Sequence, residues 1–520
     1  MTGRRALATV AVVALLAGTG CFPGDQSDRG HASAGGSVTV ALGVHPGTHD
    51  PALASSPEAL QALWLVHTPL LTYARVEGAA GTRLAPGLAA EMPELSEDGR
   101  TLTLTLREGL RYSDGQPVLA GDFERAVKRA LRLHPRGVEL FGNVRGARRA
   151  ARSLPADTDI SGIAADGRTG EVRIDLIAPD PSFPWSLAAP MAAPVPAGTP
   201  VRELSDSPPP GVGPYRLGAP REGDEFVLAR RQGFGLPGVP AGNVDEVAGR
   251  VVEDPAAQAR AGIDSQVDVA QGRPPVDLLP RIRSEYKNRY SEHATPALDY
   301  LAMDVSRRPF SDVEMRRAVS FAIDEAALKR LSDGFLEPTC NAIPPQVAGY
   351  RGLDPCPYGD REGDSDLVRA RALVETSRAV QPPVLVTGGG LGGHAAERYL
   401  ADTLDKIGLE ARRARTPRER AQAQIAFARR LPALPLPAGY LQIVDDGVLD
   451  RRIELMEREA DAVEDGEQWA ALDREIVESA EVAPYGVETT GVLMSERMDA
   501  ENCRRFHPVF GLDWSSLCLR

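Results

Sequence analysis

The stretch TLTLTLREGLRYSDGQPVLAGDFERAVKRALRL, residues 101–133, contains a strand, a turn and a helix in immediate succession. Threonine and leucine alternate over residues 101–107, which predicts a strand with one buried face. Asp114 and Gly115 follow as a turn, because glycine accepts a positive φ at little cost. Residues 119–133 then repeat apolar side chains at helical spacing, with Asp122 in the first turn.

Strands and helices alternate on both sides of this block, which predicts a mixed α/β protein. The further predicted strands are residues 37–43, 171–177, 384–387 and 409–414. The further predicted helices are residues 57–71, 313–331 with Ser311 as its cap, 393–407, 449–463 and 467–480. Proline-rich stretches at 190–200 and 208–214 indicate crossings between subdomains.

The N-terminus has the layout of an export signal. Arg4 and Arg5 precede an apolar run over residues 6–17, and small residues then lead to Cys21. This run is shorter than the roughly 20 residues that a membrane-spanning helix needs. The segment LAGTGC resembles a bacterial lipoprotein processing site, although Gly18 stands where such sites prefer leucine. We expect a lipid on Cys21; the alternative is an ordinary signal peptide.

Composition narrows the class of protein further. The polar segment 22–36 predicts a flexible tether. The net charge of -13 makes nucleic acid a poor partner.

Four cysteines besides Cys21 form two close pairs, Cys340 with Cys356 and Cys503 with Cys518. An exported chain favours two disulfides here; the alternative is free buried thiols, and the absence of a CxxC or Cys/His cluster disfavours a zinc site.

Three segments, in order, resemble the peptide-type (family 5) solute-binding proteins of ABC importers. They are residues 84–131, GVGPYRL at 211–217 and RPFSDVEMRRAVSFAIDEAAL at 308–328. The resemblance implies a two-lobed periplasmic-binding-protein-like fold (type II, with an extra middle subdomain) and a hinge between the lobes. We expect lobe I at 37–60, 190–270 and 481–520, the middle subdomain at 61–189, and lobe II at 271–480.

The resemblance also implies a ligand enclosed between the lobes, with no cofactor and no metal. The predicted ligand contacts are His45, Thr48 and His49 after the first strand, Tyr215, the turn residues Thr387, Gly388 and Gly389, then Arg429, Tyr440 and Trp514. His45, His49 and Asp50 together could instead ligate a metal, but Pro46 and Gly47 prevent a helix from bringing both histidines to one face. The GGGLGG sequence at 388–393 fits a dinucleotide fingerprint, which we reject for an exported chain.

One segment departs from the family pattern. Peptide-binding members usually carry a tryptophan-rich segment with acidic residues in lobe II, one of which pairs with the α-amino group of the peptide. The corresponding residues 423–447 contain no tryptophan, and Asp445 is their first acidic residue. Arg429 and Arg430 stand there instead and would favour an anion or a carboxylate; the alternative is that both are solvated.

The sequence therefore predicts a non-catalytic, monomeric receptor. It would bind a small molecule or peptide and deliver it to an ABC permease, while a lipid anchor holds it at the outer face of the cytoplasmic membrane. One alternative is a surface lipoprotein that kept the fold without transport and serves as a sensor or a partner-binding protein. An exported hydrolase is disfavoured, because SEYK at 284–287 lacks the partner motifs of a penicillin-recognising enzyme and no GxSxG or HExxH motif occurs.

Overall fold

The computed structural model describes residues 35–153, 158–359, 365–376, 381–444, 446–459 and 463–520. The predicted export signal, Cys21 and nearly all of the predicted tether lie outside these ranges. Among the described residues, no helix is both long enough and apolar enough to span a lipid bilayer.

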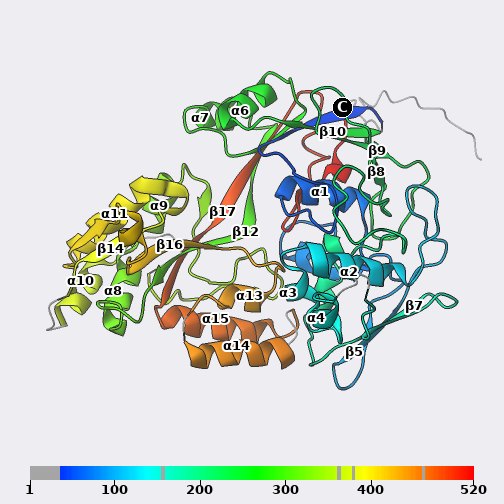
Figure 1. Ribbon diagram of the computed structural model, residues 1–520. Coiled ribbons are helices and arrows are strands. Elements are labelled where there is room, and N and C mark those ends of the chain that lie inside the picture. The colour runs from blue at the N-terminus through cyan, green and yellow to red at the C-terminus, as the bar shows by residue number, and fades with distance from the viewer. Residues whose placement is uncertain (1–34, 154–157, 360–364, 377–380, 445, 460–462) are drawn as a thin grey trace, which may run out of the picture.

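One eleven-stranded sheet runs through both halves of the molecule, in the order β15-β14-β16-β12-β17-β11-β1-β10-β9-β8, with β13 paired to β17. Its longest members, β12 (Tyr290–Met303) and β17 (Val482–Met494), are antiparallel neighbours. Figure 1 shows these two strands running between a body that contains α1 and α2 and a body that contains α9 and α11. We call β12 and β17 the crossing strands.

The strands on either side of the crossing strands belong to different bodies. On one side lie β1 (Ser37–Leu42), β8 (Tyr215–Gly218), β9 (Phe226–Arg230), β10 (Glu246–Val251) and β11 (Val269–Gly272). On the other lie β14 (Val384–Thr387), β15 (Ala411–Arg413) and β16 (Ile425–Arg430). The short strand β13 (Leu336–Glu337) pairs with β17 on the edge that faces away from β12. The two-lobed arrangement is therefore present. The predicted residue bounds of the lobes remain a prediction.

The strand, turn and helix predicted at 101–133 are confirmed. Strand β5 (Thr101–Thr105) buries Leu102 and Leu104 on one face, as the alternation requires. Helix α2 (Asp122–Leu133) begins three residues later than predicted. The same part of the chain, between residues 94 and 186, also forms β4 (Glu94–Leu95), β6 (Ile163–Asp166), β7 (Glu171–Asp175), α3 (Gly137–Phe141), α4 (Ala147–Ala150) and α5 (Phe183–Ser186).

Two predicted helices are shorter than their periodicity suggested. Residues 57–71 form α1 (Pro57–Val66) and then, after a break, β2 (Leu71–Tyr73), which pairs with β3 (Leu84–Pro86). Residues 313–331 form α8 (Val313–Ala322) and α9 (Glu325–Leu331).

The break between α8 and α9 has a local cause. Ile323 is extended, with a ψ of 133°, and the carboxylate of Asp324 accepts a hydrogen bond from the backbone N–H of Ala327. Asp324 therefore caps a new helix. Asp312, not the predicted Ser311, caps α8 through the N–H of Glu314.

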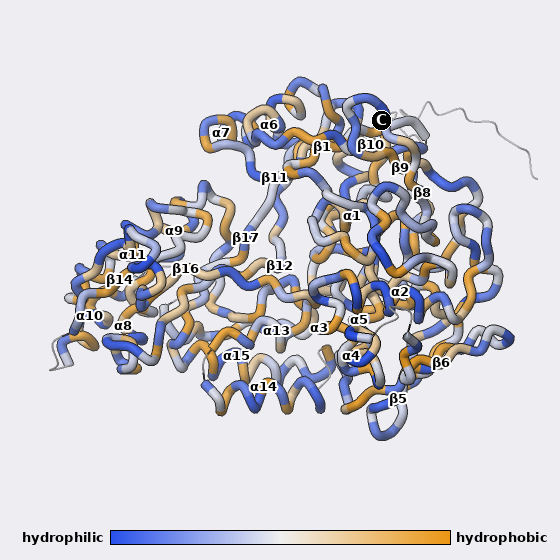
Figure 2. Tube along the Cα trace, viewed as in Figure 1, coloured by the Kyte–Doolittle hydropathy of each residue, from blue (hydrophilic) through white to orange (hydrophobic). Residues whose placement is uncertain are grey.

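Helices also cover the C-terminal half of the chain. These are α10 (Leu367–Thr376), α11 (Gly393–Lys406), α12 (Pro417–Arg420), α13 (Pro437–Leu441), α14 (Gly447–Glu459) and α15 (Gly466–Glu478). Figure 2 shows mixed hydrophilic and hydrophobic colouring along α14, of which Leu449 and Ile453 are buried. Further short elements are α6 (Pro255–Ile263), α7 (Leu279–Glu285), β18 (Phe506–His507) and β19 (Gly511–Leu512).

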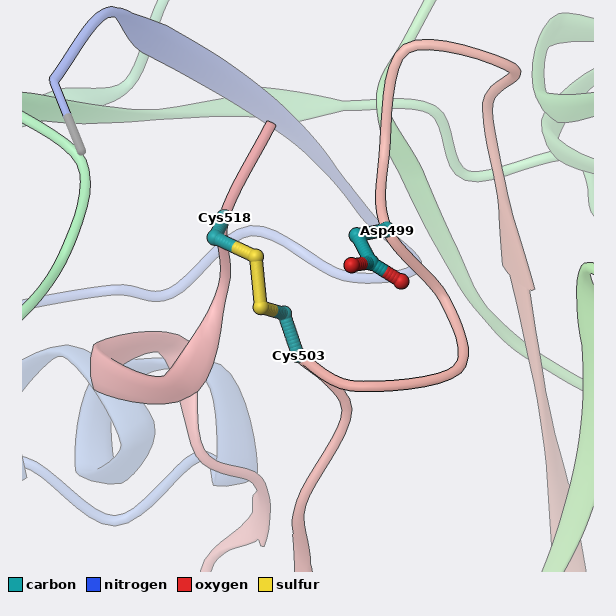
Figure 3. A group of neighbouring side chains, drawn as sticks. All are labelled: Asp499, Cys503 and Cys518. Carbon is teal, nitrogen blue, oxygen red and sulfur yellow. A yellow bond between two sulfur atoms is a disulfide. The ribbon is translucent and has the colours of Figure 1, made fainter. Parts of the chain in front are cut away.

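Both predicted disulfides are present. The Cα atoms of Cys340 and Cys356 are 5.9 Å apart, and those of Cys503 and Cys518 are 5.5 Å apart. Figure 3 shows the second disulfide beside the carboxylate of Asp499. This group places three residues of metal-binding types together, but the two sulfur atoms are bonded to each other. Asn502 donates two hydrogen bonds to the carboxylate. The group is therefore a structural cross-link.

Candidate functional site

A cavity of about 790 Å³ lies between the subdomain that contains α3 and α5 and the segment that follows β16. Arg136, Glu139 and Asp180 line it on one side, and Arg430 and Glu457 line it on the other. Helix α14 lies beside α3 and α4 in Figure 1, at the lower edge of the molecule. The volume falls within the range of small-molecule sites, about 300–1,000 Å³.

The wall of this cavity carries both signs of charge. Burial raises the pKa of Asp180, and burial together with Asp180 raises the pKa of Glu457. Arg430 is held in place because its Nε–H donates to the carbonyl oxygen of Gly439, 2.6 Å away. A wall of this kind suits a solute that carries an ammonium group, a carboxylate, or both.

A second polar site lies on the crossing strands. Nη2 of Arg429 on β16 is 2.8 Å from Oε2 of Glu488 on β17, and Nη2 of Arg273, just after β11, is 2.7 Å from the same oxygen. The side chain of Glu488 is 4% exposed, whereas those of Arg429 and Arg273 are 54% and 35% exposed. One buried carboxylate therefore holds two partly exposed guanidinium groups.

Asp299 completes this group. It stands opposite Arg429 in the register of β12 and β16, and its side chain is buried. Burial and the carboxylate of Glu488 raise the pKa of Asp299 to about 7, against the opposing effect of Arg429 and Arg273. Oδ2 of Asp299 has no hydrogen-bond partner in the described part of the chain. We call Arg273, Asp299, Arg429 and Glu488 the crossing-strand cluster.

The glycine turn after β14 lies on the same face of β16 as Arg429. A Cβ atom on Gly388 would lie 2.4 Å from the carbonyl oxygen of Phe427, and one on Gly390 would lie 2.8 Å from the hydroxyl of Tyr485. Phe427 precedes Arg429 by two residues, so both side chains point to one face. Gly388 and Gly389 have φ values of +96° and +74°, which only glycine adopts readily. Thr387 ends β14 at the start of this turn.

The three predicted contacts after β1 lie together but do not form a metal site. Nε2 of His45 is 2.9 Å from Glu225, and the hydroxyl of Thr48 accepts from the N–H of Asp50. His49 packs on Phe226 with ring centroids 4.9 Å apart, and burial lowers its pKa to about 4. Asp50 does not point its carboxylate at the two histidines as a metal ligand would. Its two carboxylate oxygens accept hydrogen bonds from the guanidinium group of Arg129, at 2.9 and 2.7 Å.

Three predicted ligand contacts are corrected by the structure. Tyr215, Tyr440 and Trp514 are completely enclosed in the core. The hydroxyl of Tyr215 donates to the carbonyl oxygen of Val244, and that of Tyr440 donates to Pro296, each at 2.8 Å. Their large rings fill the interior under the sheet, where they gain more from packing than from a solvent-facing position.

Residue type alone did not single out Arg273, Asp299 and Glu488. Two of them carry a usable signal: Glu488 is an isolated acid within the largely apolar run 482–494, and Asp299 is the one acid in the C-terminal half of β12, residues 297–303. A lone acid in a strand that is buried on both faces requires a specific partner. The sequence does not reveal that Arg273, more than 200 residues away, supplies one.

Comparisons with known proteins agree with this architecture. The family described as bacterial extracellular solute-binding proteins, family 5, middle, matches residues 83–426. The glutathione-binding protein GsiB of Escherichia coli (strain K12) is 28% identical over 294 residues, which are 55% of this chain and 52% of that protein. The chain thus matches about half the length of this relative.

Solved structures match over nearly the whole chain. A clavulanic acid biosynthesis oligopeptide binding protein 2 superposes with a TM-score of 0.81 at 21% identity, covering 94% of this chain and 96% of that one. The periplasmic murein tripeptide binding protein MppA, in an unliganded open form, gives 0.76 at 17% identity, covering 94% and 98%. NikA from Brucella suis, in complex with Fe(III)-EDTA, gives 0.73 at 18%, covering 93% and 100%. At these identities the likeness concerns the fold.

Proposed function

The chain belongs to the family 5 bacterial extracellular solute-binding proteins, and on that premise we propose that it is the receptor of an ABC importer for a small peptide or peptide-like solute. The receptor performs no catalysis. It closes on the solute between its two lobes and passes it to a membrane permease. Closure requires that the solute bind the closed form more tightly than the open form.

The cavity of about 790 Å³ is the observation that carries this proposal. Its two walls come from residues 136–186 and 430–458, which are far apart in sequence and belong to different parts of the fold. A solute bound there touches both parts at once, so binding and closure are coupled. Arginine and carboxylate side chains on the same wall suit the two charged ends of a peptide.

The names of the related proteins support the same class of solute. Glutathione, an oligopeptide and a murein tripeptide each occur in the name of one relative or structural neighbour. All three solutes contain amide bonds and carboxylates. The absence of tryptophan from residues 423–447 favours a pocket shaped differently from that of the usual peptide-binding members.

The proposed lobe bounds follow the predicted ones: 37–60, 190–270 and 481–520 for lobe I, 61–189 for the middle subdomain, and 271–480 for lobe II. In this proposal the crossing strands provide the hinge. A lipid on Cys21 tethers a monomeric receptor to the outer face of the cytoplasmic membrane through residues 22–36, where it stays close to its permease.

Affinity selection tests the proposal. The purified protein is incubated with glutathione and with a pool of tripeptides, and native mass spectrometry identifies what stays bound. We expect one or a few solutes to be retained at a stoichiometry of one. A charge-matched pool of free amino acids is the control. If no peptide is retained and none raises the melting temperature, the receptor proposal is wrong for this solute class.

A further inference from the structure

A group of arginines lies at the outer end of the sheet, away from the crossing strands. Residues 411–420 form β15, which is the last strand on that side of the sheet, and α12. These ten residues contain five arginines and one acid, Glu419, although the whole chain carries a net charge of -13. The segment therefore reverses the charge of the protein locally.

Arg412 and Arg413 show on which face of the sheet this charge lies. Neighbouring residues of a strand point to opposite faces. Nε of Arg413 is 2.7 Å from Glu397 on α11, whereas Nη2 of Arg412 is 2.8 Å from Glu419 on α12. Helices α11 and α12 therefore lie on opposite faces of β15, and the acids of α11 are not neighbours of the arginines around α12.

A second loop adds two arginines to the same surface. Nη1 of Arg307 donates to the carbonyl oxygen of Gln422, 3.1 Å away and two residues after α12. Arg308 follows, and both arginines are exposed. We call the arginines of this surface the basic edge: Arg307, Arg308, Arg412, Arg415, Arg418 and Arg420.

The acids of this surface leave most of the basic edge unpaired. Asp304 pairs with Arg307, with Oδ2 and Nε 3.1 Å apart, and Glu419 pairs with Arg412. Glu410, just before β15, is a third acid. Six arginines thus face three acids. The arginines that are exposed and form no ion pair with any residue that the structure describes are Arg308, Arg415, Arg418 and Arg420.

The basic edge is spread over a surface and does not converge on one point. Helix α12 belongs to the connection from β15 to β16, and these two strands flank β14. Two strand spacings separate them, roughly 10 Å. None of the six arginines lines the cavity of about 790 Å³. A spread of exposed guanidinium groups suits a layer of phosphate groups better than a single small anion.

A membrane lies within reach of the basic edge in the arrangement proposed above. The tether of residues 22–36 would extend to at most about 50 Å. It leads into β1, which belongs to the body with α1, whereas β14 lies in the body with α9 and α11 (Figure 1). An anchor at one body leaves the other free to turn, and a second contact in that other body would fix which side faces the lipid.

We propose that the basic edge docks on the head groups of anionic phospholipids and so holds the body with α9 and α11 against the membrane. Positive side chains near a negatively charged lipid surface are attracted to it, and arginine binds phosphate oxygens with paired N–H donors. The rest of this acidic chain is repelled by the same surface, so the basic edge decides the orientation. The inference goes beyond transport and depends on neither the solute nor the cavity.

Quenching by labelled lipid tests the docking. The full chain carries a fluorescent dye at Ala421→Cys, an exposed position directly after α12. It is mixed with phosphatidylcholine vesicles, or with vesicles that also contain phosphatidylglycerol, and both kinds carry a head-group quencher. We expect quenching to be at least about twofold stronger with phosphatidylglycerol. The increase should disappear in 1 M salt, where the Debye length falls to about 3 Å.

Two labelling controls accompany this measurement. The protein without the introduced cysteine, treated with the same dye, gives the background from Cys21. A dye at Glu222→Cys lies in the exposed loop between β8 and β9, at the opposite end of the sheet. Its quenching is expected to respond less to phosphatidylglycerol than that of the dye at position 421.

Replacing three arginines of the basic edge together locates the contact. Arg415→Gln, Arg418→Gln and Arg420→Gln are expected to remove the increase, whereas lysine at the same three positions is expected to keep most of it. The melting temperature should not change, because these side chains are exposed. The matched control removes the same charge from exposed arginines in and beside α4, which are Arg145, Arg149 and Arg152.

The outcomes decide the proposal without reference to any solute, so the receptor function is tested separately. Equal quenching in both kinds of vesicle overturns lipid docking and leaves an acidic protein as the partner that fits the basic edge. An increase that survives the glutamine variant overturns it as well. Equal losses in the glutamine variant and in the α4 control would show an effect of overall charge, which also overturns a specific contact.

Discussion

Arg429 and Glu488 form an ion pair in which Nη2 and Oε2 are 2.8 Å apart, although the two residues lie on strands separated by β12 in the sheet order. The carboxylate is almost fully buried and the guanidinium is half exposed. The pair therefore joins a buried charge on a crossing strand to the solvent-facing end of β16. Arg273 approaches the same carboxylate from the other side.

Glu488→Gln is expected to lower the free energy of unfolding by about 1–3 kcal/mol, because two arginines lose the buried charge that they share. Urea unfolding measures the change. Glu292→Gln is the matched control, since Glu292 accepts from Arg283 at 2.7 Å in a more exposed position, where an ion pair contributes about 0–1 kcal/mol. Equal losses in the two variants would contradict the role given to Glu488.

Asp299 is expected to make stability depend on pH. Its folded pKa of about 7 lies above the ordinary value of 3.8, so the native state holds an extra proton between these two values. The free energy of unfolding contributed by this group is therefore highest below pH 4 and falls as the pH rises toward 7. Near Asp299 the charged or titratable neighbours are Glu488, Arg429, Arg273 and Tyr485.

Asp299→Asn removes this titration. Its stability relative to the natural protein is expected to rise by about 1–4 kcal/mol between pH 4 and pH 8, measured by urea unfolding at a series of pH values. Other titrating groups cancel in the difference between the two proteins. A difference that stays constant across this range would show that Asp299 is ionised throughout.

Each disulfide is expected to stabilise the protein by about 3 kcal/mol, as predicted for loops of this length by the chain-entropy account. Cys340 and Cys356 are 16 residues apart, and Cys503 and Cys518 are 15 apart. Replacing either pair by serine should lower the unfolding midpoint. Intact mass should rise by four hydrogens on full reduction, two for each disulfide; an unchanged mass would mean that neither bond forms in the isolated protein.

Gly388→Ala is expected to cost more stability than Gly393→Ala. Both glycines have positive φ, +96° and +52°, so both variants are expected to cost backbone strain of about 1–3 kcal/mol. A Cβ on Gly388 would also meet Phe427 at 2.4 Å, whereas one on Gly393 meets nothing within 4 Å. The extra overpacking adds about 1–3 kcal/mol. Thermal unfolding of the two variants gives the comparison, and equal effects would show that the turn can shift away from β16.

Helix ends were less predictable than helix positions. The apolar spacing of residues 313–331 continues through Ile323 and Asp324 without a visible break, yet the chain forms two helices there. The carboxylate of Asp324 caps the N-terminus of α9. Such side-chain capping competes with continuation of the preceding helix, α8. At 66–71 the helix stops because Leu71 pairs with Pro86 in a strand, a contact that no local pattern reports.

Among the candidate site residues, the position of the glycine turn was easier to predict than that of the aromatic side chains. The glycine-rich composition of residues 388–390 predicts a turn by itself. Tyr215 and Trp514 resemble pocket aromatics in sequence but lie in the core, because an aromatic ring suits either place and the sequence does not say which face of a strand or turn is covered.

The sequence by itself determined the alternation of strands and helices, the strand-turn-helix of residues 101–133, the pairing of four cysteines and the family. Each of these depends on local periodicity, on turn chemistry or on spacing along the chain. The tertiary structure alone decided that Arg273, Asp299, Arg429 and Glu488 meet. These residues come from strands and a loop that become neighbours only when the sheet assembles, and the burial that raises the pKa of Asp299 exists only in that packed state.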